Sequence, residues 1–184
     1  MELQQLLKEC RQGSLAAQKC LYDELSAGMY LLCRRYMKTN EDAEEMMLNG
    51  FLKCFASLSS FEYKNDATAM GWIKKIMINE CLMQLRKKNS FLLTIGSDTD
   101  EAATGETALE KLSAEEIFRL ITRLPVGYRT VFNLYVVEGM NHREIASTLG
   151  ISEGTSKSQL NKARNLLQQL IIQNDIDYAA KKTK

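Results

Sequence analysis

The sequence predicts an all-α protein made of two small helical domains joined by a flexible linker. The chain of 184 residues contains one proline, Pro125, and few stretches in which apolar and polar residues alternate as they do in strands. Apolar residues recur at helical spacing instead, except between Asn89 and about Ala108, where Gly, Ser, Thr and acidic residues dominate. The predicted parts are 1–89, an acidic linker at 90–112, and 113–184.

The N-terminal domain is expected to hold four helices. Their predicted ranges are 2–11, 15–37, 41–58 and 68–88. Ser14 and Asn40 can cap the second and third helices, because a short polar side chain accepts a hydrogen bond from the first turn. Gly28 is a point where the second helix can break. The polar segment 59–66 before the fourth helix is expected to be a loop.

The C-terminal domain begins near Ser113 with a helix that Pro125 ends. Because proline suits a first helical turn, a further helix is expected to start there and to run to Glu138 and Gly139. The helices that follow lie within 141–170. They complete an all-helical second domain.

The stretch from Asn141 to Leu170 has the pattern of a helix-turn-helix. Asn141 is a suitable N-cap with Glu144 three residues later, and Gly150 stands where the first helix should end. Ser152 can cap the second helix. The outer face of that helix is basic and rich in hydroxyl groups, which suits contact with a major groove. The alternative is an ordinary helical hairpin whose polar face meets only water.

Composition restricts the class of protein. With 45% apolar and 26% charged residues the chain is expected to fold as a soluble protein. No apolar run approaches the roughly 20 residues that span a bilayer, and residues 1–13 lack the apolar core of a signal peptide. We therefore expect a cytoplasmic protein without membrane insertion.

The cysteines and the single histidine do not suggest a metal site. The five cysteines all lie in the first half without C-x-x-C spacing, and His142 is far from them in sequence. We expect buried reduced thiols, no metal and no cofactor, with His142 a surface residue in the first turn of its helix.

Charge is segregated although the net charge is only +1. Three basic clusters are found at 34–38, 74–88 and 157–164, and two acidic blocks at 41–45 and 98–110. This separation suits one surface for DNA and another for a protein partner. Chance clustering on solvated helices is the alternative for any single cluster.

Motifs in both halves match one family. Those of the C-terminal half are Leu124-Pro125-x-x-Tyr128-Arg129 with Val131-Phe132, Glu138-Gly139-x-x-x-Arg143-Glu144-Ile145-Ala146, and Gly150-Ile151-Ser152-x-Gly154-Thr155-x-Lys157-Ser158. Those of the N-terminal half are Asp42-Ala43-Glu44-Glu45 with Phe51, and Gly71-Trp72-Ile73-Lys74-Lys75-Ile76-Met77-Ile78-Asn79 leading to Leu85-Arg86-Lys87. Together they resemble the extracytoplasmic-function (ECF) sigma factors of the sigma-70 family, over nearly the whole chain apart from the linker.

The resemblance implies a bacterial promoter-specificity subunit that binds core RNA polymerase and promoter DNA, helps to open the DNA and is not an enzyme. It also suggests an anti-sigma partner. The residues implied in minus-35 binding are Thr155, Lys157, Ser158, Asn161, Lys162 and Arg164. Those implied in minus-10 binding are Trp72, Lys74, Lys75 and Asn79, with the loop 61–70 receiving an unstacked base. Those implied in polymerase binding are Asp42, Glu45, Leu48, Asn49 and Leu52.

Trp72 has two interpretations, stacking on a base or packing in the core. Several other positions depart from the family pattern. Leu48 and Asn49 stand where a glutamine and an acidic residue are usual, and Ser156 stands where valine is usual. The buried hydroxyl of Ser156 must then be satisfied, for example on a carbonyl one turn back. Gln159 replaces a frequent arginine, which predicts the loss of a phosphate contact.

Two other functions share part of this pattern. A one-component transcriptional regulator with a helical N-terminal domain would have the same helix-turn-helix, but no obvious use for a basic, tryptophan-bearing helix. An enzyme in a helical bundle could use the carboxylates of Asp42 and Glu45, but no Glu-x-x-His pair or phosphate-binding glycine loop accompanies them.

Overall fold

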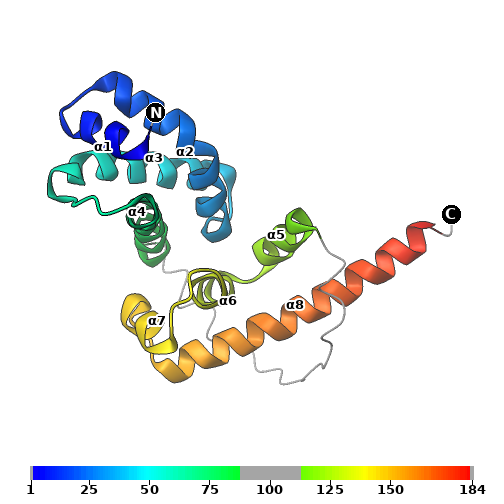
Figure 1. The fold of residues 1–184 in the computed structure, drawn as a ribbon. Helices are drawn as coiled ribbons and strands as arrows, with labels where there is room; N and C mark the ends of the chain where they lie inside the picture. The colour runs from blue at the N-terminus through cyan, green and yellow to red at the C-terminus, as the bar shows by residue number, and fades with distance from the viewer. Residues whose placement is uncertain (1, 88–112, 183–184) are drawn as a thin grey trace. The chain divides into compact units, whose positions relative to one another are not determined.

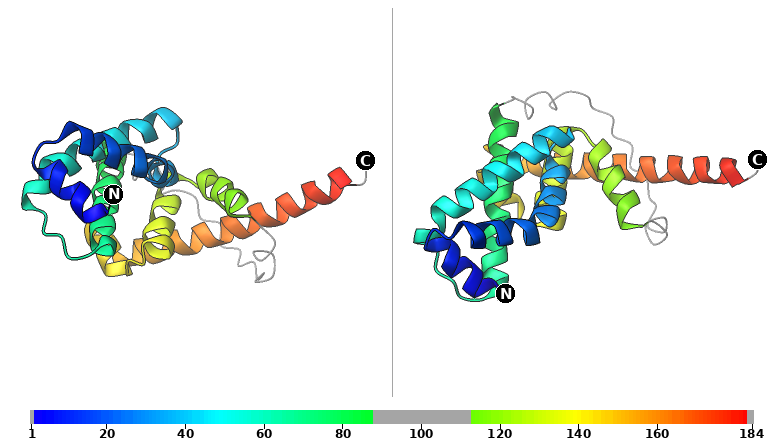
Figure 2. Two further views of the ribbon diagram at one scale, coloured as in Figure 1. Left: turned by 45° about the horizontal axis from the view of Figure 1, so that its top comes forward. Right: turned by 90° about the horizontal axis from the view of Figure 1, so that it is seen from above.

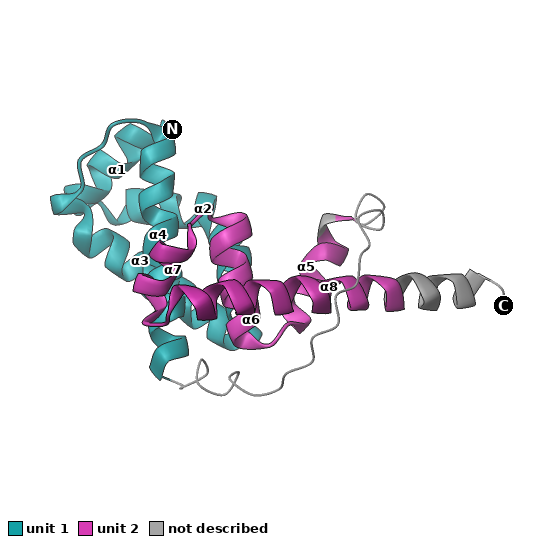
Figure 3. Cartoon of the chain, turned by 90° about the horizontal axis from the view of Figure 1, so that it is seen from below, with its two compact units in different colours: residues 1–88 teal, residues 89–184 magenta. Residues whose placement is uncertain are grey.

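The computed structural model of the chain describes residues 2–87 and 113–182, and side chains at 2–87, 113 and 115–173. All regular elements within these ranges are helical. The chain divides into two compact units, Met1–Lys88 and Asn89–Lys184, and each is described by itself (Figures 1 and 3). The predicted fold of two helical regions is confirmed, and the predicted linker, 90–112, lies outside the described residues.

Unit 1 is a bundle of helices. Its elements are α1 (Leu3–Arg11), α2 (Leu15–Tyr36), α3 (Asn40–Ser57), the 3-10 turn η1 (Leu58–Ser60) and α4 (Asp66–Lys87). Helices α2, α3 and α4 pack on one another, while α1 lies against α2 and η1 (Figure 2). Their buried faces include Tyr36, Ile73 and Met77.

The helix expected at 15–37 is confirmed, and one local expectation for unit 1, the cap at Asn40, is wrong. Helix α2 continues through Gly28 without a break, because buried side chains on both sides of the glycine, Leu21 and Leu32 among them, hold it against the bundle. Helix α3 includes Asn40, and its cap is Thr39, whose hydroxyl accepts a hydrogen bond from the amide of Asp42 at 3.1 Å. The expected cap at Ser14 is confirmed.

Gly50 of α3 lies against Met77 of α4. A Cβ at this position would collide with the thioether of Met77, which is fully buried on α4. The absence of a side chain at Gly50 therefore lets the two helices approach closely at this point.

Unit 2 contains the predicted helix-turn-helix, which two short helices precede in the chain. Its elements are α5 (Ala114–Arg123), α6 (Val126–Phe132), the π-helical turn η4 (Asn133–Val137), α7 (His142–Leu149) and α8 (Glu153–Lys182). The single helix expected from Pro125 to Glu138 is thus interrupted by η4. The wider turn brings both Asn133 and Leu134 into the interior.

A buried arginine joins α5 to α6. Arg129 is only 1% exposed, and its guanidinium donates a 3.0 Å hydrogen bond to the carbonyl of Thr122 near the end of α5. At the other end of α5, Ser113 and Glu116 form a capping box. The first contact ties the end of α5 to α6, and the second closes its N-terminal turn.

Candidate nucleic-acid interface

Helix caps and one glycine in a left-handed conformation form the turn between α7 and α8 and set its limits. Asn141 and Glu144 form the expected capping box at the start of α7. Gly150 ends the helix in the left-handed region, at φ +69°, where a side chain would be strained. The hydroxyl of Ser152 then accepts a hydrogen bond from the amide of Thr155 at 2.9 Å and starts α8. All three expected features of the turn are confirmed.

The first turns of α8 present polar side chains on one side and bury the other. Lys157, Ser158, Asn161 and Arg164 are exposed, whereas Thr155 and Lys162 are half-buried. Leu160 and Ala163 are buried on the opposite side. From Gly154 to Gln173 the chain contains three basic residues and no acidic one. Glu153, at the first position of α8, is the one acidic side chain beside them, so the surface keeps a net positive charge that attracts an anion such as a phosphate.

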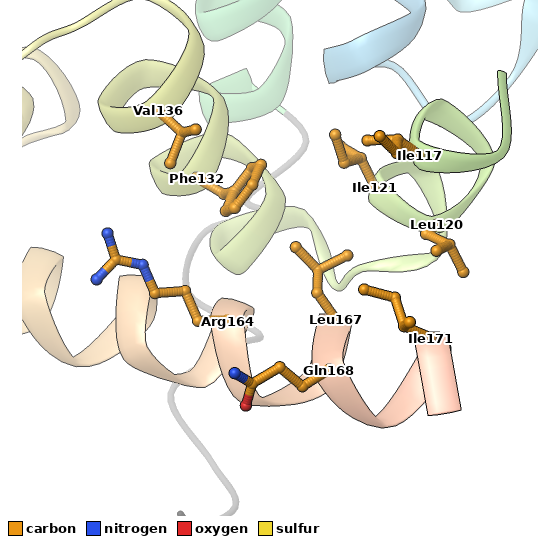
Figure 4. A pocket seen from close by; sticks show the side chains of 9 residues that line it. All are labelled: Ile117, Leu120, Ile121, Phe132, Val136, Arg164, Leu167, Gln168 and Ile171. Carbon is orange, nitrogen blue, oxygen red and sulfur yellow. The ribbon is translucent and has the colours of Figure 1, made fainter. Parts of the chain in front are cut away.

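Arg164 lies at the end of this surface over an aromatic ring. Its guanidinium carbon is 5.8 Å from the centroid of Tyr135, and Figure 4 shows the side chain reaching from α8 toward Val136. An arginine over a ring face keeps N–H donors at its edge, which suits the predicted role as a phosphate anchor.

The single histidine is not the simple surface residue that we expected. His142 is half-buried, and its ring stacks on Tyr135 with 4.6 Å between centroids. Its Nδ1 lies 2.9 Å from the hydroxyl oxygen of Ser156, which is fully buried. The Ser156 hydroxyl, for which the sequence suggested a carbonyl one turn back, thus has the imidazole of the neighbouring helix as a partner.

Gln159 does not stand at a DNA-facing position. Its side chain is only 6% exposed, so this glutamine has no surface to offer to a phosphate. The side-chain oxygen of Gln159 accepts no hydrogen bond from the part of the chain that the structure describes. Gln159 belongs instead to the buried side of α8.

In unit 1, the basic candidates lie on the exposed side of α4. Lys74, Lys75 and Asn79 are exposed. Trp72 is half-buried and stacks on Phe61, with 4.2 Å between ring centroids and 20° between planes. Both rings pack against the apolar cluster of α1 and α2. This geometry is that of a packed tryptophan, the second of the two interpretations.

The segment before α4 is short and tied down. Because α4 begins at Asp66, only 61–65 of the expected loop 61–70 is non-helical. The Tyr63 hydroxyl donates to the carboxylate of Asp66 at 2.6 Å, and this hydrogen bond raises the pKa of Tyr63. The guanidinium of Arg11 donates to the carbonyl of Ser59.

The polymerase-binding candidates lie on α3. Leu48 and Leu52, one turn apart, are 43% and 67% exposed, and Glu45 is exposed beside them. Asp42 and Asn49 are half-buried. Large apolar side chains that remain in solvent next to an acidic residue are typical of a surface that contacts another protein.

The described residues offer no site for a metal. No group of three or more His, Cys, Asp and Glu side chains among them is arranged to hold an ion. All five cysteines are free thiols; Cys20 is half-buried and the other four are buried. Burial raises the pKa of Cys54 to about 12. Within the same residues, no helix has the length and apolar character needed to cross a membrane.

An apolar pocket of about 330 Å³ lies in unit 2 where α5, α6, η4 and α8 meet (Figure 4). Ile117, Phe132 and Leu167 are among its lining side chains, and Arg164 stands at one side. The packing of α5 on α8 therefore leaves apolar surface uncovered within this unit.

Comparisons with known proteins match both units. Residues 21–91 match the family model Sigma-70 region 2, and residues 114–167 match Sigma-70, region 4. Over 147 residues the chain is 30% identical to the ECF RNA polymerase sigma factor SigM of Mycobacterium tuberculosis, covering 78% of this chain and 71% of the relative. It is 23% identical to SigW of Bacillus subtilis, an ECF RNA polymerase sigma factor, covering 92% and 96%.

Solved structures give similar matches. CnrH in complex with the cytosolic domain of CnrY matches at a TM-score of 0.47 and 19% identity, covering 90% of this chain and 94% of the other. The sigma factor RpoE of Bartonella quintana, in complex with the anti-sigma factor NepR, matches at a TM-score of 0.49 and 24% identity, covering 83% and 97%. The two family models and the similarity to SigM confirm that the chain belongs to the ECF family of RNA polymerase sigma factors.

Proposed function

We propose that this ECF sigma factor binds core RNA polymerase through unit 1 and directs it to promoters that unit 2 recognises at the minus-35 element. Unit 1 would also bind the minus-10 element and assist DNA opening. The observation that carries the proposal is the exposed side of the first turns of α8, on which Lys157, Lys162 and Arg164 outnumber the single acidic residue Glu153, presented by a well-capped helix-turn-helix. A recognition helix of this kind enters the major groove with its N-terminal residues against base edges.

Within unit 2, different side chains would serve different purposes. Lys157 and Asn161 are exposed one turn apart near the start of α8, where base edges come within reach. Arg164 and Lys162 would bind phosphates, which set the register of the protein on DNA but carry no sequence information. The hydroxyl groups of Ser158 and Thr155 can donate hydrogen bonds to base edges or to phosphates.

Within unit 1, two surfaces would have separate partners. The exposed leucines of α3, Leu48 and Leu52, with the acidic Glu45, would dock on the polymerase clamp as a helix lies in a groove. Lys74, Lys75 and Asn79 of α4 would bind the single strand of the opened minus-10 element through phosphates and base edges. Trp72 would support this surface by packing on Phe61.

The proposal also includes a non-catalytic role in the cytoplasm and an anti-sigma partner. Membership of the family supports both. The uncovered apolar pocket beside α5, together with Val136, which is 50% exposed, supports a further protein contact on unit 2. A co-purifying protein would count as this partner only if it abolished promoter-specific transcription in a purified system.

Association with purified core RNA polymerase tests the proposal for unit 1. The full chain should form a stoichiometric complex on size exclusion, and Leu52→Asp should abolish it. Leu15→Asp is the matched control, because Leu15 is a 79% exposed leucine on α2 outside the proposed surface. Sequence-specific DNA binding without any polymerase complex would instead support a one-component regulator.

A further inference from the structure

A directional contact joins the two helices of the helix-turn-helix. His142 stands at the first position of α7, and its Nδ1 lies 2.9 Å from the hydroxyl oxygen of Ser156 in the first turn of α8. Ser156 is completely buried, so its hydroxyl cannot turn to water when the histidine is lost. A hydrogen bond between two helices is directional, so the pair favours the arrangement of α7 and α8 in which it is formed.

The imidazole is itself held from a third element. Tyr135 of η4 stacks on the ring at 4.6 Å between centroids and 25° between planes, and the guanidinium of Arg164 lies over the same tyrosine. Tyr135, His142, Ser156 and Arg164 therefore form one cluster. It links η4, α7 and α8 at one place, beside the side chains that are proposed to bind DNA.

We propose that His142 is a positioning residue for DNA binding: through Ser156 it sets the rotation of α8 about its own axis, and through Tyr135 it keeps Arg164 in place. The proposal rests on the DNA-binding function proposed above. Ile145 of α7 and Leu160 of α8 are also buried, but apolar packing is not directional and tolerates small rotations.

Rotation of α8 matters because Lys157 directly follows Ser156. If the direction of the Ser156 side chain changes, α8 rotates about its axis. Lys157, and Asn161 one turn later, then no longer point at the part of the DNA that they contact in the wild type. Contacts with base edges require close alignment, whereas a lysine finds some phosphate in most orientations. Loss of the His142 pair should therefore reduce specific binding more than non-specific binding.

The pair has a clear spectroscopic signature. His142 is the only histidine of the chain, so a single imidazole appears in a nitrogen-15 spectrum. In its neutral form the wild-type ring should show one fixed tautomer, since the bond to Ser156 fixes the role of Nδ1. Ser156→Ala should give averaged tautomers. An unchanged spectrum in that variant would overturn the proposal.

Binding is measured with the full chain and core RNA polymerase, on the DNA duplex that the wild-type complex enriches from a random library. His142→Phe keeps an aromatic ring for Tyr135 but removes Nδ1, and Ser156→Ala removes the hydroxyl. Each should weaken specific binding by about fivefold, the effect of one ordinary hydrogen bond. The double variant should be no weaker than either single variant, because both remove the same contact. Binding to an unrelated duplex should be unchanged.

Two further variants separate this proposal from the proposed function. All measurements are made at temperatures at which each variant is fully folded by circular dichroism. If His142→Phe and Ser156→Ala bind as wild type while Lys157→Ala is weakened, the positioning role is wrong and the DNA-binding function stands. If Lys157→Ala also binds as wild type, or no duplex is enriched, the proposed function fails and the positioning role fails with it. Arg164→Ala should weaken both duplexes, as expected for a phosphate contact.

Discussion

Lys53 on α3 and Glu80 on α4 form an ion pair with 2.6 Å between Nζ and Oε1. The Glu80 side chain is 9% exposed, whereas that of Lys53 is 50% exposed. Lys53 follows the proposed polymerase contact Leu52 in sequence, and Glu80 follows the proposed DNA contact Asn79. The pair therefore joins the two helices of unit 1 that carry the candidate surfaces.

Removal of Lys53 should destabilise the protein. Lys53→Met leaves the carboxylate of Glu80 buried without its partner, which should lower the free energy of unfolding by about 1–2 kcal/mol, less than for a fully buried pair because Lys53 is half in solvent. Urea unfolding followed by circular dichroism measures the change. Lys19→Met, which breaks the exposed pair with Asp23, is the control and should have no measurable effect. Equal stability of the two variants would refute this role of the pair.

Two helical glycines should respond in opposite directions to the same substitution. Gly28→Ala meets nothing within 4 Å and should stabilise α2 by up to about 1 kcal/mol through helix propensity. Gly50→Ala gains the same propensity, but its methyl group collides with the buried Met77, and overpacking of this kind costs about 1–3 kcal/mol. Thermal unfolding of the two variants compares them directly. A rise in melting temperature for Gly50→Ala would show that α3 and α4 do not pack as described.

The Cys54 thiol should make stability fall at alkaline pH. Burial raises its pKa from about 9 to about 12, so the unfolded chain loses this proton first as the pH rises. Its contribution is complete below about pH 9 and should then be lost at about 1.4 kcal/mol per pH unit up to about pH 12. Unfolding in urea at two alkaline pH values measures the slope. Cys54→Ala should reduce the slope; an unchanged slope would mean that Cys54 ionises equally well in the folded protein.

Lys157 should contribute to DNA affinity through charge. Lys157→Ala should weaken DNA binding several-fold and lower the slope of log affinity against log salt by about 1, because one fewer counterion is released. Association with core polymerase should not change. Lys19→Ala removes an exposed lysine of unit 1 and is the matched control. A salt slope that is the same for both variants would exclude Lys157 from the DNA contact.

Features set by neighbouring residues could be predicted from the sequence, and features set by distant ones could not. The caps at Ser14 and Asn141 and the end of α7 at Gly150 depend on backbone groups within a few positions, so their residue types are sufficient. The partner of Ser156 is fourteen positions away on another helix, and no local pattern indicates it. The continuity of α2 at Gly28 likewise depends on packing with α3 and α4.

The buried position of Gln159 had a signal in the sequence. Ser156, Gln159 and Ala163 recur at intervals of three and four, which is the spacing of one helix face, and all three are buried. Interpretation by family pattern placed Gln159 toward DNA instead. The spacing along the helix places Gln159 on the buried face, as the structure shows.

Transcription with purified components tests the central claim most directly. Core RNA polymerase from the source bacterium is mixed with the full chain and fragmented genomic DNA, and the start sites of the transcripts are mapped. We expect start sites that are absent with core polymerase alone and that share two upstream elements at fixed spacing. Transcription from these start sites should be lost with Leu52→Asp and weakened with Lys157→Ala. The same start sites with and without the chain would contradict its assignment as the promoter-specificity subunit.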